Sequence, residues 1–171
     1  MLSRILIAGL AAILSGCASN DKALDTAKEV SLIDPDIPPA VAGEDGWGYQ
    51  QSAEADLDRD GVSERIVLTA RAEMVRGRPA WDDGQPWQVY VEAADGTRRY
   101  VYAQRLQLGA LTMRLALDEA GDPASIVLFE HLPDRLRLFE AFYGGPEELR
   151  TLLRFERMLD PRGELASPML P

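Results

Sequence analysis

The sequence holds only one cysteine, Cys17, and only one histidine, His131, among 171 residues. A single cysteine excludes an internal disulfide, so the fold must depend on an apolar core or on a metal. A single histidine, in an expected loop, gives little basis for a His-based metal site or a Ser-His-Asp triad. The sequence also lacks a Gly-rich phosphate-binding motif and any Cys-based metal-ligand spacing.

Basic residues are scarce as well, because 18 Lys and Arg stand against 28 Asp and Glu, for a formal net charge of −10. A chain this acidic is repelled by nucleic acid and by anionic membrane surfaces, so no nucleic-acid partner is expected. Long apolar runs are missing too. The run from Ile5 to Leu14 is too short to cross a bilayer as a helix, which needs roughly 20 residues, and no later run is longer.

The first residues nevertheless have the three parts of a secretory signal. Arg4 supplies a positive charge, the apolar run follows, and small residues precede Cys17. The segment Leu14-Ser15-Gly16-Cys17 resembles the lipobox of bacterial lipoprotein precursors. In that family the signal is cut before the cysteine, the thiol carries diacylglycerol, and the new amino group is often acylated with palmitate-type chains. The alternative is an ordinary signal peptide with a chance cysteine.

The resemblance implies a cell-envelope location with lipid on Cys17 as the membrane anchor. Two or more acyl chains hold a protein firmly, whereas one anchors it only marginally. In Gram-negative members of the family the residue after the cysteine influences sorting, and Ala18 in place of Asp favours the outer membrane, facing the periplasm. The expected organisation is therefore a signal peptide over 1–16, a lipidated N-terminus and Pro/Gly-containing tether over 17–45, and one globular domain over 46–171.

The globular part shows patterns typical of antiparallel β structure. Apolar residues are β-branched or alternate with polar ones over 66–69, 87–92, 99–102, 111–117, 126–129 and 136–142, and Asp95-Gly96 is a hairpin turn signal. The prediction is a mainly β fold with a C-terminal helix over 147–159, where Pro146 suits a helix start, although the same run is compatible with a strand. An α+β fold is the alternative.

A possible internal repeat of 60 residues accompanies these strands. Residues 56–68 and 116–128 share Leu, Asp, Gly and Ile-Val-Leu at equivalent positions without a gap. We interpret the similarity as two degenerate sheet units, against the alternative that a turn followed by an Ile-Val-Leu strand recurs by chance in β proteins.

The strongest chemical motif is the acidic loop, residues 56–64, in which carboxylates alternate and Gly61 permits a sharp turn. Calcium takes six to eight oxygen ligands, and such a loop supplies several. The loop resembles the Asp-x-Asp-x-Asp-Gly loop of FG-GAP and VCBS repeats, although Glu replaces the last Asp, Arg59 and Arg65 lie nearby, and two units cannot close a propeller. The resemblance implies a structural calcium ion bound by Asp56, Asp58, Asp60, the Val62 carbonyl and Glu64. The alternative is a turn in which Asp side chains accept hydrogen bonds from backbone amides.

A second candidate site is the segment in which Trp81 and Trp87 flank Asp82 and Asp83. Exposed tryptophans beside carboxylates stack on sugars or on a protein partner, whereas buried ones only cover the end of a sheet. Trp47 and Tyr49 carry the same ambiguity.

Three functions follow from these features. The first is a non-enzymatic lipoprotein that binds an envelope protein or another envelope component, with a structural calcium ion in the acidic loop. The second is a module for peptidoglycan or another glycan that binds through Trp81 and Trp87. The third and weakest is a metal-dependent envelope hydrolase, for which the sequence offers no catalytic residue.

Overall fold

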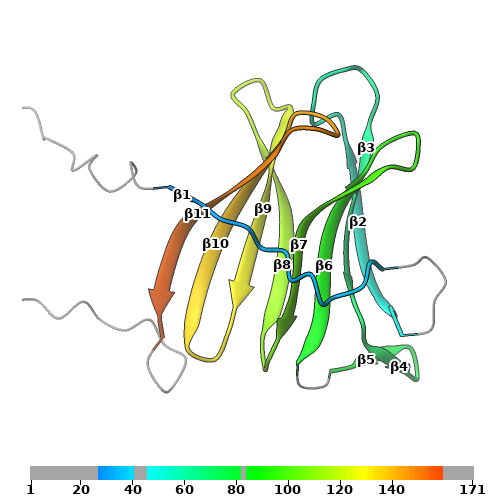
Figure 1. Ribbon diagram of the computed structural model, residues 1–171, viewed down its shortest axis with the longest axis vertical. Coiled ribbons are helices and arrows are strands. Elements are labelled where there is room, and N and C mark those ends of the chain that lie inside the picture. The colour runs from blue at the N-terminus through cyan, green and yellow to red at the C-terminus, as the bar shows by residue number, and fades with distance from the viewer. Residues whose placement is uncertain (1–26, 41–45, 82–83, 160–171) are drawn as a thin grey trace, which may run out of the picture.

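The computed structural model describes residues 27–40, 46–81 and 84–159, and within them the regular structure is β-strand without helix. The strands form two antiparallel sheets and a small extra hairpin (Figure 1). The predicted mainly β, antiparallel class is therefore confirmed. Among the described residues no helix is long and apolar enough to cross a membrane.

The first sheet is an up-and-down meander in the order β2-β3-β6-β7. A two-stranded hairpin, β4–β5, is inserted in the connection from β3 to β6. The elements are β2 (Tyr49–Ala55), β3 (Glu64–Ala70), β4 (Glu73–Val75), β5 (Arg78–Ala80), β6 (Gln85–Glu92) and β7 (Arg98–Leu106).

The second sheet repeats this meander with the next strands, in the order β11-β10-β9-β8, and adds the short β1 beside β11. Its elements are β1 (Lys28–Glu29), β8 (Ala110–Leu117), β9 (Pro123–His131), β10 (Arg135–Tyr143) and β11 (Leu149–Met158). Each of the six segments predicted as strands lies within one of the observed strands.

The helix predicted over 147–159 is wrong, because Leu149–Met158 form the strand β11. This strand pairs with β10 along its whole length and with β1 on its other side. Its β-branched and aromatic members, such as Thr151 and Phe155, suit a pleated surface, and sheet pairing outweighs the helical spacing of its leucines.

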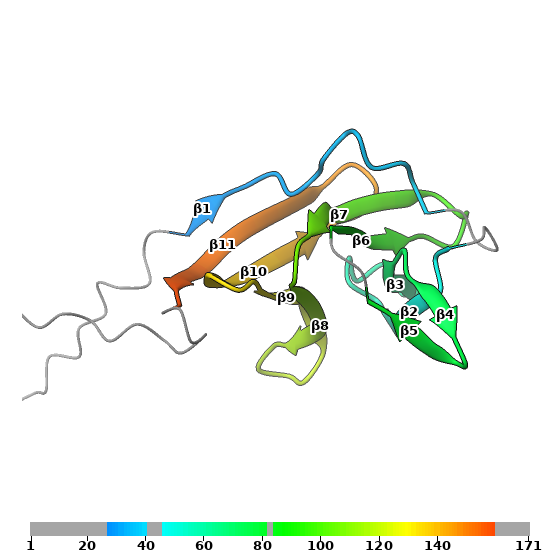
Figure 2. The ribbon, with the colours of Figure 1, turned by 90° about the horizontal axis from the view of Figure 1, so that it is seen from below.

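Residues 27–40, hereafter the strap, lie against both sheets, which differs from the free tether expected there. The Val30 amide donates to the Thr151 carbonyl on β11 at 3.0 Å. The Leu32 carbonyl then accepts from the Ala103 amide on β7 at 2.8 Å. The strap therefore joins the outer edges of the two sheets, and Figure 2 shows it running along one side of the molecule across both.

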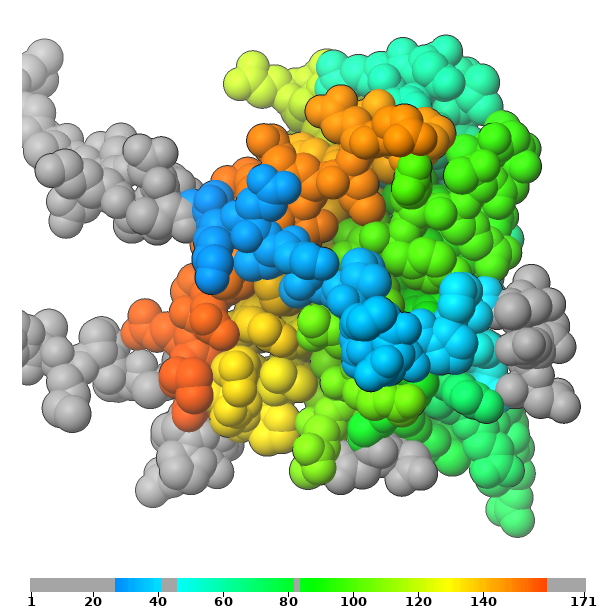
Figure 3. All heavy atoms as spheres, in the orientation of Figure 1, coloured from blue at the N-terminus to red at the C-terminus, as the bar shows by residue number. Residues whose placement is uncertain are grey.

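The end of the strap also covers the outer face of the first sheet. Gln88 on β6 holds it there, because its Oε1 accepts from the Ala40 amide at 2.8 Å and its Nε2 donates to the Pro38 carbonyl at 2.7 Å. Val67 and Tyr90 are buried beneath. The first sheet is therefore covered on both faces, and in the space-filling view of Figure 3 the strap forms a continuous ridge over the strands.

The main core lies between the inner faces of the two sheets. Side chains from both sheets meet there, among them Leu68, Val89, Ile126, Leu128 and Phe139. A polar contact crosses the same space, where the buried Tyr102 hydroxyl on β7 donates to Glu130 Oε2 on β9 at 2.6 Å. Arg137 on β10 donates from Nε to the other oxygen of this carboxylate, Glu130 Oε1, at 2.7 Å. A buried carboxylate is tolerated because both of its oxygens are satisfied.

Candidate functional site

The acidic loop connects β2 to β3 and turns through two residues of positive φ, Arg59 (63°) and Gly61 (90°). Its aspartates accept hydrogen bonds from the loop's own backbone. The Gly61 amide donates to Asp56 Oδ2 at 3.0 Å, and the Val62 amide donates to Asp60 Oδ1 at 2.7 Å. The turn expected from the sequence is thus present, with carboxylates that organise the backbone.

Three of the predicted ligands converge. Asp56, Asp58 and Glu64 each offer a carboxylate oxygen within 4.8 Å of the others, the spacing of groups that share a cation. The Asp60 carboxylate is not in this group and its side chain is exposed. The convergent set therefore supplies three of the six to eight oxygens that calcium takes, with backbone carbonyls and water as the remaining sources.

Two observations indicate that this group is more than a solvated turn. Glu64 is only 4 % exposed, and its Oε2 accepts from the Leu57 amide at 2.9 Å. Asp56 Oδ1 is buried and has no hydrogen-bond partner among the described residues. A buried carboxylate oxygen without a donor is costly, and a bound cation would remove that cost.

The electrostatics of the group point the same way. Burial raises the pKa of Glu64 above its ordinary value of 4.5, opposed by the Leu57 amide, and the negative charges of Asp58 and Asp60 raise it further. Burial also raises the pKa of Tyr143, with added contributions from Glu64 and Asp58. Burial makes the largest contribution to both increases. A bound divalent cation would replace the added repulsion at Glu64 by attraction and so lower the Glu64 pKa again.

The two arginines in and beside the acidic loop pair with acidic side chains outside it. Arg59 Nη2 lies 2.6 Å from Asp118 Oδ2, in the loop that connects β8 to β9. Arg65 Nη1 lies 3.9 Å from Glu92 Oε1. Arg59 therefore joins the acidic loop to its counterpart in the second sheet.

That counterpart, residues 118–122, has a similar turn and a different chemistry. Asp118 Oδ1 accepts from the Ala120 amide at 2.8 Å, just as Asp58 Oδ1 accepts from the Asp60 amide at 3.2 Å. Gly121 has a φ of 89°, close to that of Gly61. The positions of Asp56 and Glu64 are taken by Ala116 and Ala124, so the second loop lacks the convergent carboxylates. We therefore expect no metal in the second loop.

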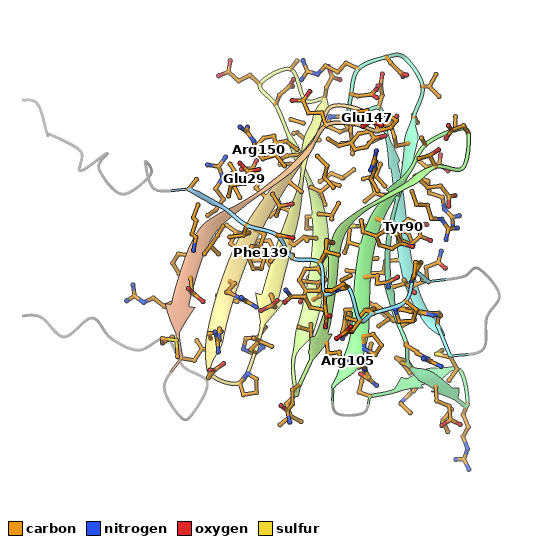
Figure 4. The ribbon with its side chains drawn as sticks, in the orientation of Figure 1. Glu29, Tyr90, Arg105, Phe139, Glu147 and Arg150 are labelled. Carbon is orange, nitrogen blue, oxygen red and sulfur yellow. The ribbon has the colours of Figure 1, made fainter. Side chains whose placement is uncertain are left out.

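The second candidate site lies at the opposite end of the sandwich. Figure 4 marks the two ends, with Glu147 in the β10–β11 loop near the acidic loop and Arg105 at the far end of β7. Trp81 is 52 % exposed and Trp87 only 3 %. Their rings stack with centroids 5.2 Å apart and planes at 7°. The two tryptophans therefore do not form one exposed surface, because Trp81 covers Trp87.

Tyr49 completes an aromatic cluster with these two residues, and its ring meets Trp81 edge-on at 5.2 Å and Trp87 at 5.7 Å. Beside the cluster is a hollow of about 680 Å³ between β2 and β8. Leu111, Thr112 and His131 also line the hollow, and no sequence pattern linked them to the tryptophans. Asp82 and Asp83 lie outside the described residues, as does Cys17 with its expected lipid.

Trp47, the remaining tryptophan, makes no ring contact with the aromatic cluster, although it lines a neighbouring hollow together with Trp81. It packs beside Val67 and Tyr90 on the outer face of the first sheet, close to the strap.

Comparisons with known proteins identified no relative of this chain. No family model matches the chain, and neither the curated proteins nor the solved structures gave a significant match.

Proposed function

We propose that this chain is a lipid-anchored, non-enzymatic domain of the bacterial cell envelope, which binds an envelope component and is stabilised by one calcium ion in the acidic loop. The convergence of Asp56, Asp58 and Glu64, with a buried and unpartnered oxygen on Asp56, carries the calcium part of the proposal. The signal segment ending at Cys17 carries the anchoring part.

A structural role for the ion follows from where the loop lies. Arg59 links the loop to the second sheet. A Cβ atom added to the buried Gly145, in the β10–β11 loop, would lie 3.4 Å from Asp58 Oδ2, so that loop also packs against the carboxylates. An ion there would hold three connections from two sheets together. The hollow beside the aromatic cluster lies at the other end of the sandwich, so a metal-dependent hydrolase has less support.

Calcium titration with thermal melting tests the ion. Millimolar calcium should raise the melting temperature of the chelator-treated protein, because a ligand that binds only the folded state stabilises it. Asp58→Ala should lose the response. Asp118→Ala, which changes the equivalent residue of the second loop, is the matched control and should keep it. No rise in the wild-type protein would end the calcium proposal.

The lipid anchor is tested separately in cells. Cys17→Ser should release the protein from the membrane fraction or leave the precursor uncut, because the serine hydroxyl cannot form the thioether. Unchanged fractionation and processing of the Cys17→Ser protein would contradict the anchor, whatever the outcome of the calcium experiment.

A further inference from the structure

The two sheets meet along two seams that differ in how they are closed. The strap joins β11 to β7 along one seam through backbone hydrogen bonds. Along the other seam β2 and β8 are the outer strands of their sheets, and no pairing joins them among the described residues. The Arg59–Asp118 ion pair spans this second seam at the acidic end. At the aromatic end the seam widens into the hollow.

The side chains that line this hollow form a chemically consistent set. Three are aromatic, the cluster of Tyr49, Trp81 and Trp87. Three others, Gln85, Thr112 and His131, can donate or accept hydrogen bonds. No Asp, Glu, Lys or Arg belongs to the described lining. Aromatic faces with a few neutral polar groups suit a neutral ligand that presents both an apolar face and hydroxyl groups.

Trp87 adds an independent observation. Its side chain is almost wholly buried, it lines the hollow, and its indole Nε1–H has no acceptor among the described residues. Buried N–H groups are almost always paired, and leaving one unpaired costs about 1–3 kcal/mol. The Nε1 atom has almost no accessible surface, so a ligand oxygen in the hollow would supply the missing acceptor only after the surrounding side chains shift.

We propose that the hollow binds a ring of a neutral saccharide. The C–H face of a sugar ring is apolar and slightly positive, and it packs on the electron-rich face of an aromatic ring such as the half-exposed Trp81. Sugar oxygens then accept from Trp87 Nε1–H and exchange hydrogen bonds with the neutral polar side chains. This assignment rests on the proposed role as an envelope-binding domain and names its ligand class, but it does not depend on the calcium ion at the other end.

The binding experiment uses the folded protein and three soluble probes, tri-N-acetylchitotriose, cellotriose and maltotriose. Titration calorimetry and tryptophan emission should show saturable binding of at least one probe at micromolar to millimolar concentration. Trp87→Phe keeps an aromatic side chain but removes the pyrrole ring with its N–H, and it should weaken binding roughly tenfold. Trp81→Ala removes the stacking face and should weaken binding by tenfold or more.

Two controls make the result specific. Phe155→Ala removes another partly exposed aromatic side chain, on β11, and should leave binding unchanged. Trp47→Phe removes the tryptophan of the other cluster and should keep the emission change.

The proposal is overturned if no probe binds the folded protein, if both Trp variants bind as tightly as wild type, or if only an apolar probe such as a fatty acid binds. Each titration is repeated in calcium and in chelator. Saccharide binding in both buffers supports the hollow even if calcium fails to raise the melting temperature, so the two proposals fail separately.

Discussion

The two sheets are built alike, and they differ in what covers them. Each is a four-stranded meander that begins with a hairpin, and the equivalent strands β3 and β9 both carry Ile-Val-Leu. Ile66 and Leu68 face the shared core, as do Ile126 and Leu128. Between them, Val67 is fully buried under the strap, whereas Val127 is partly exposed. The same Ile-Val-Leu pattern thus lies in two environments, because the end of the strap packs over Val67.

The hairpin loops differ in the same way. Both turn through an Asx hydrogen bond and a glycine of positive φ. Only the acidic loop places three carboxylates together, and only its Glu64 is buried at the start of a strand. The shared features form the turn, and the added carboxylates of the first loop form the candidate calcium site.

The largest loss of stability is expected from removing Glu130, whose carboxylate joins the two sheets through Tyr102. Glu130→Ala should destabilise the protein by about 3 kcal/mol or more, since it leaves Arg137 and the buried Tyr102 hydroxyl without their partner and opens a cavity. Denaturant unfolding measures the change. Glu140→Ala is the control, because Glu140 also pairs with an arginine, Arg154, but is less buried. Equal losses from the two variants would refute a special role for the inter-sheet contact.

The second prediction compares equivalent valines. Val67→Ala should cost about 2 kcal/mol, because it removes two buried methyl groups between β6 and the strap. Val127→Ala should cost clearly less, since solvent already reaches that side chain. Chemical denaturation of the two variants, side by side, checks the difference. If the costs are the same, the strap does not cover the first sheet in solution.

The third prediction is a smaller change in stability, for Glu64→Gln, whose direction tests the electrostatics of the acidic loop. At neutral pH in chelator it should stabilise the protein, because a neutral amide avoids the cost of burying a charge and the repulsion by Asp58, and it can still accept from the Leu57 amide. The same variant should lose the stabilisation by calcium. Melting in both buffers measures the two effects, and a destabilised variant in chelator would argue against electrostatic strain at this site.

The pH dependence of this variant follows from the raised pKa. The folded protein binds a proton at Glu64 more tightly than the unfolded chain, so ionised Glu64 costs stability above its folded pKa. The advantage of Glu64→Gln should therefore shrink as pH falls through that folded pKa and vanish near the ordinary value of 4.5. If Glu64→Gln gained stability over wild type as the pH fell, the pKa of Glu64 would be lowered in the folded protein and not raised.

The smallest effect is expected for Arg59→Ala, which breaks the ion pair between the two hairpin loops. The Arg59 side chain is 63 % exposed, and exposed pairs contribute little. Stability in chelator should barely change and calcium binding should persist, because Arg59 contacts Asp118 and no candidate ligand. Thermal melting with and without calcium checks both, and a lost calcium response would place Arg59 in the site.

Local patterns were sufficient for most of the strands and for one turn. Residues 87–92 were expected to alternate in a strand, and Trp87, Val89 and Val91 are all buried in the main core. Asp95-Gly96 was expected to form a hairpin turn, and Gly96 has a φ of 83° while its amide donates to the Ala93 carbonyl at 2.9 Å. These features depend on alternation and on the φ preference of glycine, which neighbouring residues decide.

The sequence-based predictions were less accurate for segments whose contacts come from residues distant in the sequence. Leucines at helical spacing predicted a helix at 147–159, yet β10 and β1 offer that segment a strand pairing on both edges. Prolines near 35–39 indicated a free tether, yet Gln88 binds the backbone at Pro38 and Ala40. Three of the four predicted carboxylate ligands, Asp56, Asp58 and Glu64, come together in the structure, and Asp60 is not among them.

Local patterns were enough to predict a mainly β chain with an acidic loop, because alternation, turn residues and carboxylate spacing are properties of neighbouring residues. Tertiary structure alone decided three further features. It buried Glu64, left an oxygen of Asp56 without a donor, and brought Tyr49 to the two tryptophans beside the hollow. Each depends on strands and loops that meet only when two sheets pack, and no local pattern encodes that contact.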